Sequence, residues 1–343
     1  MKGRRILIEP LPAGGHAAAL IVDGRLQDLL IDPPADDPTP RPEAIHRGKA
    51  GRPMKGLGGI IIELAGGQTG FLRTRRPPAA GRPVLVQIGG WTEPGKAPPV
   101  GDRLRLKGRC AVLTPGAPGL NISRRIRDEE VRAALAGIAE EAMADADDDL
   151  GLILRTRAGD MHNDAILNEI ASLRAMWSRI AADMAGPPAC LLEGLGAAEE
   201  ALREWDAPAT DIVEGPDAFG DLWDEIEALR QPRVALGAGF MSVEPTLALV
   251  AVDVNTGGDL TPAAALKVNL AAARELPRQL RLRGLGGQIT VDFAPLTRAE
   301  RPRIESALNA ALREDGLDTT LAGWTPLGHL ELTRRRARRP LAG

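Results

Sequence analysis

Apolar and polar positions divide the chain into stretches of different periodicity. Short alternating runs at 4–9 and 18–32 predict strands, because period-two alternation is typical of half-buried strands. From about 43 to 102, brief apolar runs such as GLGGIIIEL, AGGQTGFL and RPVLVQIGG are separated by glycines. Many short strands with glycine turns predict a small barrel of the OB type.

The remaining stretches combine helical and strand periodicity. Apolar residues recur at helical spacing in 129–143 and 163–183, with an apolar strand pattern at 151–156 between them. The last third alternates as strand 247–255, helix 261–283, strand 287–293, helix 299–314 and strand 328–333. This order predicts a βαβ unit. The whole chain is therefore expected to be a multidomain protein that mixes α/β and α+β regions.

Composition bounds the class of protein. The chain has 343 residues and 44% apolar content, which suits several folded domains. No apolar run approaches the roughly 20 residues that a membrane helix needs, so we expect a cytoplasmic protein without a membrane partner. The two cysteines, Cys110 and Cys190, are far apart and form no Cys-x-x-Cys pair. Neither a disulfide framework nor a cysteine zinc site is expected.

The charges are unevenly distributed, although the net charge is only −3. Arginines cluster at 73–76, 124–127, 278–283 and 334–339, and acidic residues at 145–149 and 221–227. Such separation is typical of a protein with a phosphate-binding face, while ordinary solvated charge is the alternative for any single cluster. Aromatic residues make up 3% of the chain and tyrosine is absent, so widespread base stacking is excluded.

Polar side chains end two apolar strands in the last third. LALVAVDVNTGGD carries Asp253 and Asn255, two residues apart and therefore on one face, and GGQITVDFAPL ends in Asp292. A right-handed βαβ crossover places the carboxyl ends of such strands at one edge of the sheet. We therefore expect Asp253, Asn255 and Asp292 to converge. The alternative is that they cap strands or form turns, as Asp and Asn often do.

Two carboxylates and an amide oxygen are hard ligands. With few histidines and no paired cysteines, the ion that suits them is Mg²⁺ or Mn²⁺ rather than Zn²⁺. Phosphodiester hydrolysis is the chemistry that fits, because such an ion activates a water and neutralises charge on the scissile phosphate. No Ser/His/Asp triad is recognisable in the sequence.

The segments ALVAVDVNTG, NLAAARELPRQLRLRGLGGQITVDF and GHLELTRRR occur in this order and together resemble the catalytic core of the ribonuclease E/G family. The resemblance implies that Asp253 and Asp292 hold Mg²⁺ and that Asn255 orients the scissile phosphate, on a DNase I-like subdomain. It implies five regions: a first RNase H-like segment at 1–42, an S1 domain with an OB fold at 43–102, a 5′ sensor at 103–195, a second RNase H-like segment at 196–231, and the DNase I-like catalytic subdomain at 232–343.

The resemblance also assigns contacts with RNA. Phe71 in GQTGFL matches a family stacking position and Lys96 a family RNA contact, whereas the second family aromatic is replaced by Ile61. Packing inside the barrel is the alternative for Phe71. In ISRRI, Arg124 and Arg125 match RNA-contacting arginines, with a solvated pair as the alternative.

A further set of positions matches the family's pocket for a 5′-monophosphate. An arginine fork and a hydroxyl, helped by backbone donors, suit such a group. The matching residues are Gly108, Val112, Arg155 and Thr156.

The sequence also departs from the family. The loop after Asn255 is short, and Arg157 is inserted after the Arg-Thr pair. The family's Cys-Pro-x-Cys zinc-link is missing, so we expect no zinc and no zinc-mediated dimer. A homodimer that forms without zinc stays open.

The function that the resemblance implies is cleavage of single-stranded RNA that carries a 5′-monophosphate, in ribosomal RNA processing and mRNA decay. Two alternatives are a non-catalytic RNA-binding protein derived from the same family and a nuclease acting on DNA.

Overall fold

The computed structural model describes residues 3–54, 56–93, 95–207, 210–237 and 239–341. They form two compact units, one built from 1–33 and 211–343 and the other from 34–210. Together they hold four sheets and several helices, so the protein is of the mixed α/β kind. Among the described residues, no helix is both long and apolar enough to span a bilayer.

The first unit contains a four-stranded sheet assembled from distant segments. Its order is β14-β1-β2-β3, with bounds Thr210–Glu214, Arg4–Pro10, His16–Val22 and Arg25–Ile31. Helix α4 (Leu222–Ala228) contributes Ile226 to the core of this region, and Phe219 packs in the same cluster. Residues about 200 positions apart in the sequence therefore share one small core.

The other sheet of this unit has six strands in the order β15-β16-β17-β18-β20-β19. Their bounds are Arg233–Ala235, Phe240–Pro245, Val250–Asn255, Gly287–Asp292, Leu330–Arg334 and Thr319–Trp324. Strands β17 and β18 are parallel, which confirms the βαβ prediction, and the four other pairings are antiparallel.

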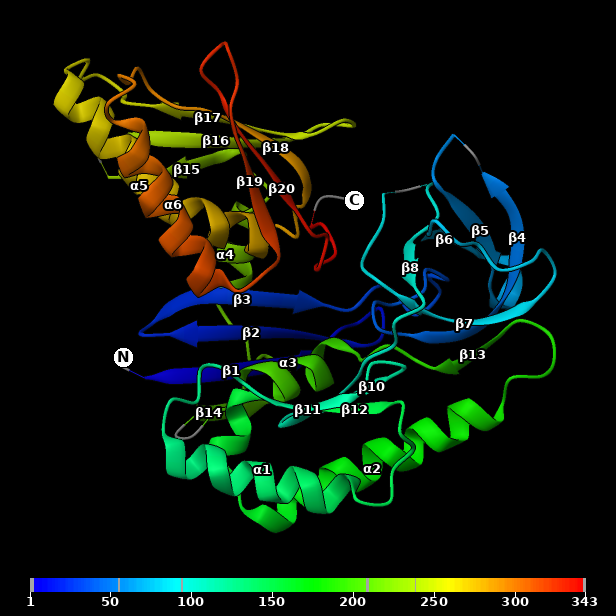
Figure 1. Cartoon of the computed structure of the whole chain (residues 1–343). Coiled ribbons are helices and arrows are strands. Elements are labelled where there is room, and N and C mark those ends of the chain that lie inside the picture. The colour runs from blue at the N-terminus through cyan, green and yellow to red at the C-terminus, as the bar shows by residue number, and fades with distance from the viewer. Residues whose placement is uncertain (1–2, 55, 94, 208–209, 238, 342–343) are drawn as a thin grey trace. The chain divides into compact units, whose positions relative to one another are not determined.

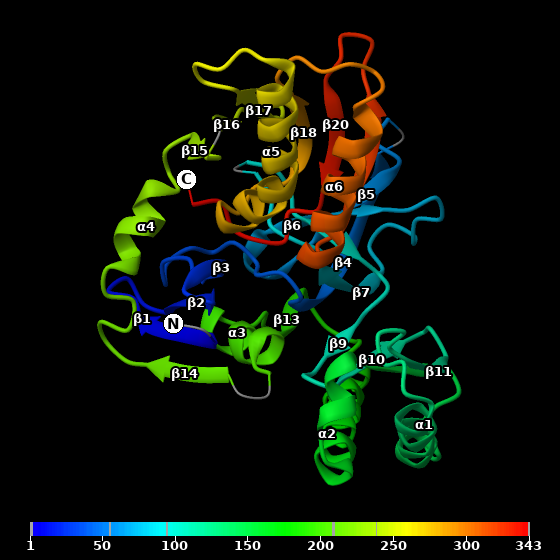
Figure 2. The ribbon, with the colours of Figure 1, turned by 90° about the vertical axis from the view of Figure 1, so that its left-hand side faces the viewer.

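Helices α5 (Pro262–Leu282) and α6 (Arg301–Asp315) cover one face of this sheet, as Figures 1 and 2 show. The start of α5 is encoded locally: Thr261 caps it by accepting from the Ala264 N–H at 3.3 Å, and Pro262 occupies the first helical position. Alternate residues such as Val252 and Val291 pack under the helices. The intervening residues, on the other face, are the exposed ones.

The second unit contains a closed barrel of five strands, consistent with an OB fold. The ring runs β4-β5-β6-β8-β7 and returns to β4, with bounds Ile45–Met54, Gly59–Glu63, Thr69–Arg73, Pro99–Gly101 and Pro83–Ile88. Strand β13 (Ala189–Leu192) lies outside this ring and pairs antiparallel with the first residues of β4. This strand lies far beyond the barrel in the sequence, so the prediction from 43–102 could not include it.

The rest of the second unit is a small sheet in the order β11-β12-β10-β9, with bounds Gly119–Ile122, Leu150–Leu154, Ala111–Pro115 and Leu106–Lys107. Helices α1 (Glu129–Met143) and α2 (Asn163–Ala182) share its core, and both confirm the predicted helices to within one residue. A shorter helix, α3 (Ala197–Trp205), follows β13.

Candidate functional site

Two carboxylates lie side by side on the exposed face of the six-stranded sheet. Asp253 of β17 and Asp292 of β18 are direct partners in the parallel register. Neighbouring strands are about 4.8 Å apart and directly paired residues point to the same side. Both residues are exposed, and the Asp292 side chain is 61% accessible. The pair therefore faces away from α5 and α6.

Asn255 joins the pair from the end of β17. It lies two residues beyond Asp253, hence on the same face, and its Nδ2 donates a hydrogen bond to Asp253 Oδ2. The amide thereby orients the carboxylate. The structure thus brings together the three residues that the strand-end pattern singled out.

The same face carries a longer row of polar side chains across five strands. Arg233 is paired with Ser242, Ser242 with Asp253, and Asp253 with Asp292. Because Val291 is paired with Leu330, the antiparallel register continues to His329, whose Nε2 is 3.8 Å from Asp292 Oδ1. The carboxylate pair thus lies between an arginine and a histidine.

Sequence reasoning did not single out His329 or Arg233. His329 lies in GHLELTRRR, which carries the family resemblance but gave this histidine no role, and Arg233 begins RVALG, which contains no recognisable motif. Both residues reach the site only through strand register. A pairing prediction for β15, β16 and β20 would have been needed to find them.

The donor set fits a hard divalent cation. Mg²⁺ in proteins is commonly held by one or two carboxylates and keeps several waters, and an exposed carboxylate pair allows this. Across the residues that the structure describes, no group of three or more His, Cys, Asp and Glu side chains is placed to hold a metal ion. Asp253 and Asp292, with Asn255 beside Asp253, are the residues that would hold Mg²⁺.

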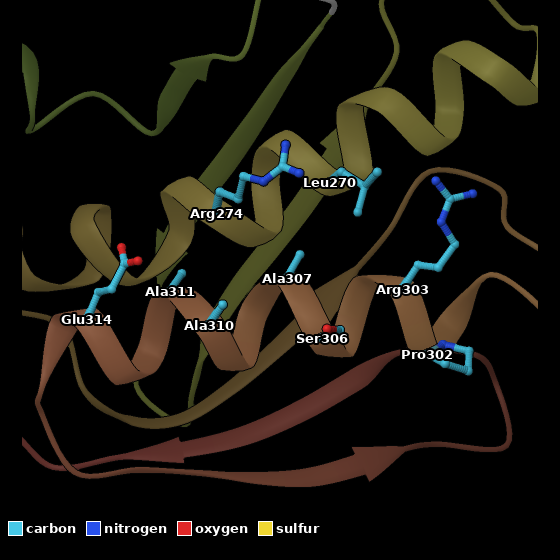
Figure 3. A pocket seen from close by; sticks show the side chains of 9 residues that line it. All are labelled: Leu270, Arg274, Pro302, Arg303, Ser306, Ala307, Ala310, Ala311 and Glu314. Carbon is cyan, nitrogen blue, oxygen red and sulfur yellow. The ribbon is translucent and has the colours of Figure 1, made fainter.

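A groove of about 690 Å³ lies on the other side of the sheet, between α5 and α6. Figure 3 shows its lining, with Leu270 and Arg274 on α5 and with Arg303 and Ala307 on α6. The buried core residues separate this groove from the carboxylate face. The polar chemistry is therefore on an open surface, which suits an extended polymer better than a small molecule.

The barrel carries a half-buried apolar pair on β5 and β6. Ile61 and Phe71 are direct cross-strand partners, and both lie outside the barrel core formed by their neighbours. One side of the Phe71 ring covers Gly59, where an added Cβ would lie 2.7 Å from the ring. The Phe71 N–H donates to Pro98 O at 2.8 Å, and exposed Lys96 pairs with Glu93 just before that segment. Phe71, Ile61 and Lys96 thus lie in one region of the surface.

Replacing Phe71 with alanine is expected to weaken binding of single-stranded RNA by about 1–2 kcal/mol, because stacking on an aromatic ring contributes about 1–3 kcal/mol per base. Replacing Ile61 with tyrosine is expected to strengthen it by about 1 kcal/mol. Equilibrium binding to an unstructured oligonucleotide measures both, with Ile61→Val as the control. If Ile61→Tyr gains no affinity and Phe71→Ala only lowers stability, the pair has a packing role.

A second cluster of candidate residues gathers where β9, β10 and β12 end. The Arg155 N–H donates to Cys110 O at 2.7 Å, and Arg155 Nη1 donates to Gly108 O at 2.7 Å. The Thr156 hydroxyl contacts the Ser123 hydroxyl at 2.9 Å. Val112 pairs with Ile153 of β12 and is 9% exposed. All four predicted pocket residues are thus on neighbouring segments.

Gly108 is required by close packing. A Cβ at this position would lie 2.2 Å from Glu169 Oε1. That oxygen accepts hydrogen bonds from the N–H groups of Cys110 and Ala111, at 2.8 and 2.9 Å. Any side chain at Gly108 would displace a carboxylate that holds the β9–β10 turn.

The cations of this cluster are paired with carboxylates of the same unit. Arg155 forms a two-point ion pair with Glu204 near the end of α3, and Arg203 pairs with Glu204 and Glu43. Burial alone would raise the pKa of the Glu204 carboxyl, but Arg155 and Arg203 offset it and hold this pKa below its ordinary value. Glu204 is therefore ionised at neutral pH.

Further ion pairs complete the cluster. Lys107 also pairs with Glu43, and Arg109 and Arg157 face Asp206. With Glu169 beside Gly108 and Glu200 acting on Arg203, these five cations meet five carboxylates and their charges balance. The candidate pair Arg124 and Arg125 is exposed just after Ser123, which also contacts Thr156.

Together, a five-stranded OB-type barrel and an open carboxylate-bearing sheet define a mixed α/β protein suited to extended polymers. The sequence model of the Ribonuclease E/G family matches residues 105–219 and 218–337, so the chain belongs to this family. The match includes the arginine cluster and the carboxylate face.

Curated relatives carry the same family names. The chain is 31% identical to Ribonuclease E of a Nostoc species over 296 residues, covering 74% of this chain and 43% of the relative. It is 27% identical to Ribonuclease G of Escherichia coli K12 over 275 residues, covering 68% of this chain and 56% of the relative. The chain spans about half the length of the curated relatives it matches.

Proposed function

We propose that the chain is a Mg²⁺-dependent endonuclease that hydrolyses phosphodiester bonds in single-stranded RNA. The observation that carries the proposal is the direct register pairing of Asp253 with Asp292 on an open face, in a chain that belongs to the Ribonuclease E/G family. The relatives named ribonuclease support RNA as the substrate class.

In the proposed mechanism the protein supplies ligands and orientation rather than a nucleophile. Asp253 and Asp292 would hold the ion through their carboxylates. The Asn255 amide holds Asp253 in place by its hydrogen bond and would orient the scissile phosphate. Bound Mg²⁺ would supply charge neutralisation and an activated water. The exposed position of the pair leaves room for the phosphodiester to enter from solvent.

We further propose that the arginine cluster favours RNA with a 5′-monophosphate. A phosphate monoester carries about −1.5 to −2 charge at pH 7. The Thr156 hydroxyl can donate to such a phosphate, and the Arg155 guanidinium would exchange its contact with Glu204 for the phosphate oxygens. Phe71, Lys96, Arg124 and Arg125 would hold the strand. Ribosomal RNA processing and mRNA decay in the cytoplasm are the proposed roles.

The domain assignment also stays a proposal. The pairing of β14 with β1 supports an RNase H-like subdomain split between 1–42 and 196–231. The six-stranded sheet with α5 and α6 on one face supports a catalytic subdomain at 232–343.

Cleavage of three matched oligonucleotides tests the function. With Mg²⁺, a single-stranded RNA with a 5′-monophosphate is expected to be cut several-fold faster than its 5′-hydroxyl form, and the DNA version not at all. Chelation of divalent ions should stop the reaction. Tight binding with unchanged RNA length over hours would instead favour a non-catalytic RNA-binding protein, and equal cleavage of DNA would favour a general nuclease.

A further inference from the structure

The carboxylate face also carries an aromatic ring that the proposed mechanism does not use. Phe240 begins β16 and is the direct cross-strand partner of Asn255, so both side chains point to the same face. The ring is half-buried and is not among the residues packed beneath α5 and α6. It therefore lies beside the candidate active residues rather than in the core.

An arginine covers one side of this ring. The Arg233 guanidinium carbon is 3.6 Å from the centre of the Phe240 ring, a close cation–π contact. Arg233 is exposed, and among the ion pairs of the described residues none involves it. The nearest acidic side chain along β16, Glu244, accepts a hydrogen bond from Ser242 at 2.5 Å. The guanidinium thus keeps its positive charge available.

The position of this stack relative to the carboxylates follows from register. Arg233 is in the same row as Asp253 and Asp292, two strands away from Asp253. With about 4.8 Å between strands, the arginine lies roughly 10 Å from Asp253. That separation is close enough for a nucleotide next to the scissile phosphate to reach the stack.

We propose that Phe240 and Arg233 form a nucleotide subsite, in which the unpaired base next to the scissile phosphate stacks on the Phe240–Arg233 platform. Bases of single-stranded RNA stack on aromatic rings and on guanidinium planes. A base within a duplex cannot reach such a platform, so the subsite selects unpaired RNA at the point of cleavage. The inference rests on the proposed nuclease function, because that function defines where the strand is cut.

The test combines binding with turnover. Oligonucleotides carry 2-aminopurine at single positions around the cleavage site, and binding is measured with chelator so that the RNA stays intact. Stacking should quench the probe at one position next to that site. Phe240→Leu, which keeps an apolar side chain, should remove this quenching and weaken binding by about 5- to 100-fold, seen in KM more than in kcat.

Further variants separate stacking from packing. Phe240→Tyr should restore the quenching, and Arg233→Lys, which keeps the charge but loses the plane, should lose most of it. Leu247 is a fully exposed residue in the turn between β16 and β17, and Leu247→Ala is the matched control, which should change nothing. Denaturation curves verify that each variant is folded.

The outcomes distinguish the subsite from the nuclease function. If Phe240→Leu leaves KM and quenching within twofold of the parent while RNA is still cut, the subsite is wrong and the nuclease function stands. If neither the parent chain nor any variant cuts RNA but quenching follows the predicted order, Phe240 and Arg233 form a base-stacking site for RNA binding and the nuclease function is wrong.

Discussion

Replacing Asp253 or Asp292 with asparagine should each abolish RNA cleavage, with a loss on the order of 10³-fold or more. Asparagine keeps the shape of the side chain but removes the charge that holds a divalent cation. Both side chains are exposed, so neither change should unfold the sheet. Single-turnover cleavage in Mg²⁺ measures the loss, and RNA binding should be kept or slightly stronger because a negative charge is removed from the face.

Glu331→Gln is the matched control for this prediction. Glu331 is exposed on β20, paired with Thr290, one row away from the carboxylates on the same face. The Glu331→Gln substitution removes one negative charge without changing Asp253 or Asp292, so the cleavage rate should stay within about threefold of the parent rate. Cleavage by both aspartate variants at a tenth of the parent rate or more would overturn the proposed metal site.

Replacing Asp315 with asparagine should destabilise the first unit by about 3–5 kcal/mol. The Asp315 side chain is 1% exposed at the end of α6, pairs with Arg334 of β20 at 2.7 Å and also pairs with Arg281 of α5. Removing one partner of a buried ion pair leaves the remaining charges with less compensation, which costs about this much, although Asp28 also lies 3.7 Å from Arg281. Burial lowers the pKa of Arg334 to about 10, while Asp28 acts in the opposite direction.

Chemical denaturation of the intact chain measures this effect. Glu314→Gln, one residue earlier on the exposed side of α6, is the control and should change the free energy of unfolding by no more than about 0.5 kcal/mol. A loss below about 1 kcal/mol in Asp315→Asn would mean that water or another group replaces the carboxylate.

Much of the fold followed from local pattern. The barrel strands fall within 45–101, close to the predicted 43–102, because glycine turns and apolar alternation are local signals. The predicted strand at 247–255 starts later, at Val250, because Thr246 and Leu249 close the turn between β16 and β17 and Leu247 is fully exposed. Apolar content alone could not distinguish that turn from a strand.

The sequence by itself identified Asp253 and Asp292 as the carboxylates at the ends of two strands, since both stand out against the apolar runs before them. Tertiary structure alone decided what surrounds them. Strand register placed Arg233 and His329 at the two ends of their row, and Phe240 beside Asn255. It was likewise tertiary packing that set Glu204 against Arg155. Such neighbours come from distant segments, and no local pattern encodes their pairing.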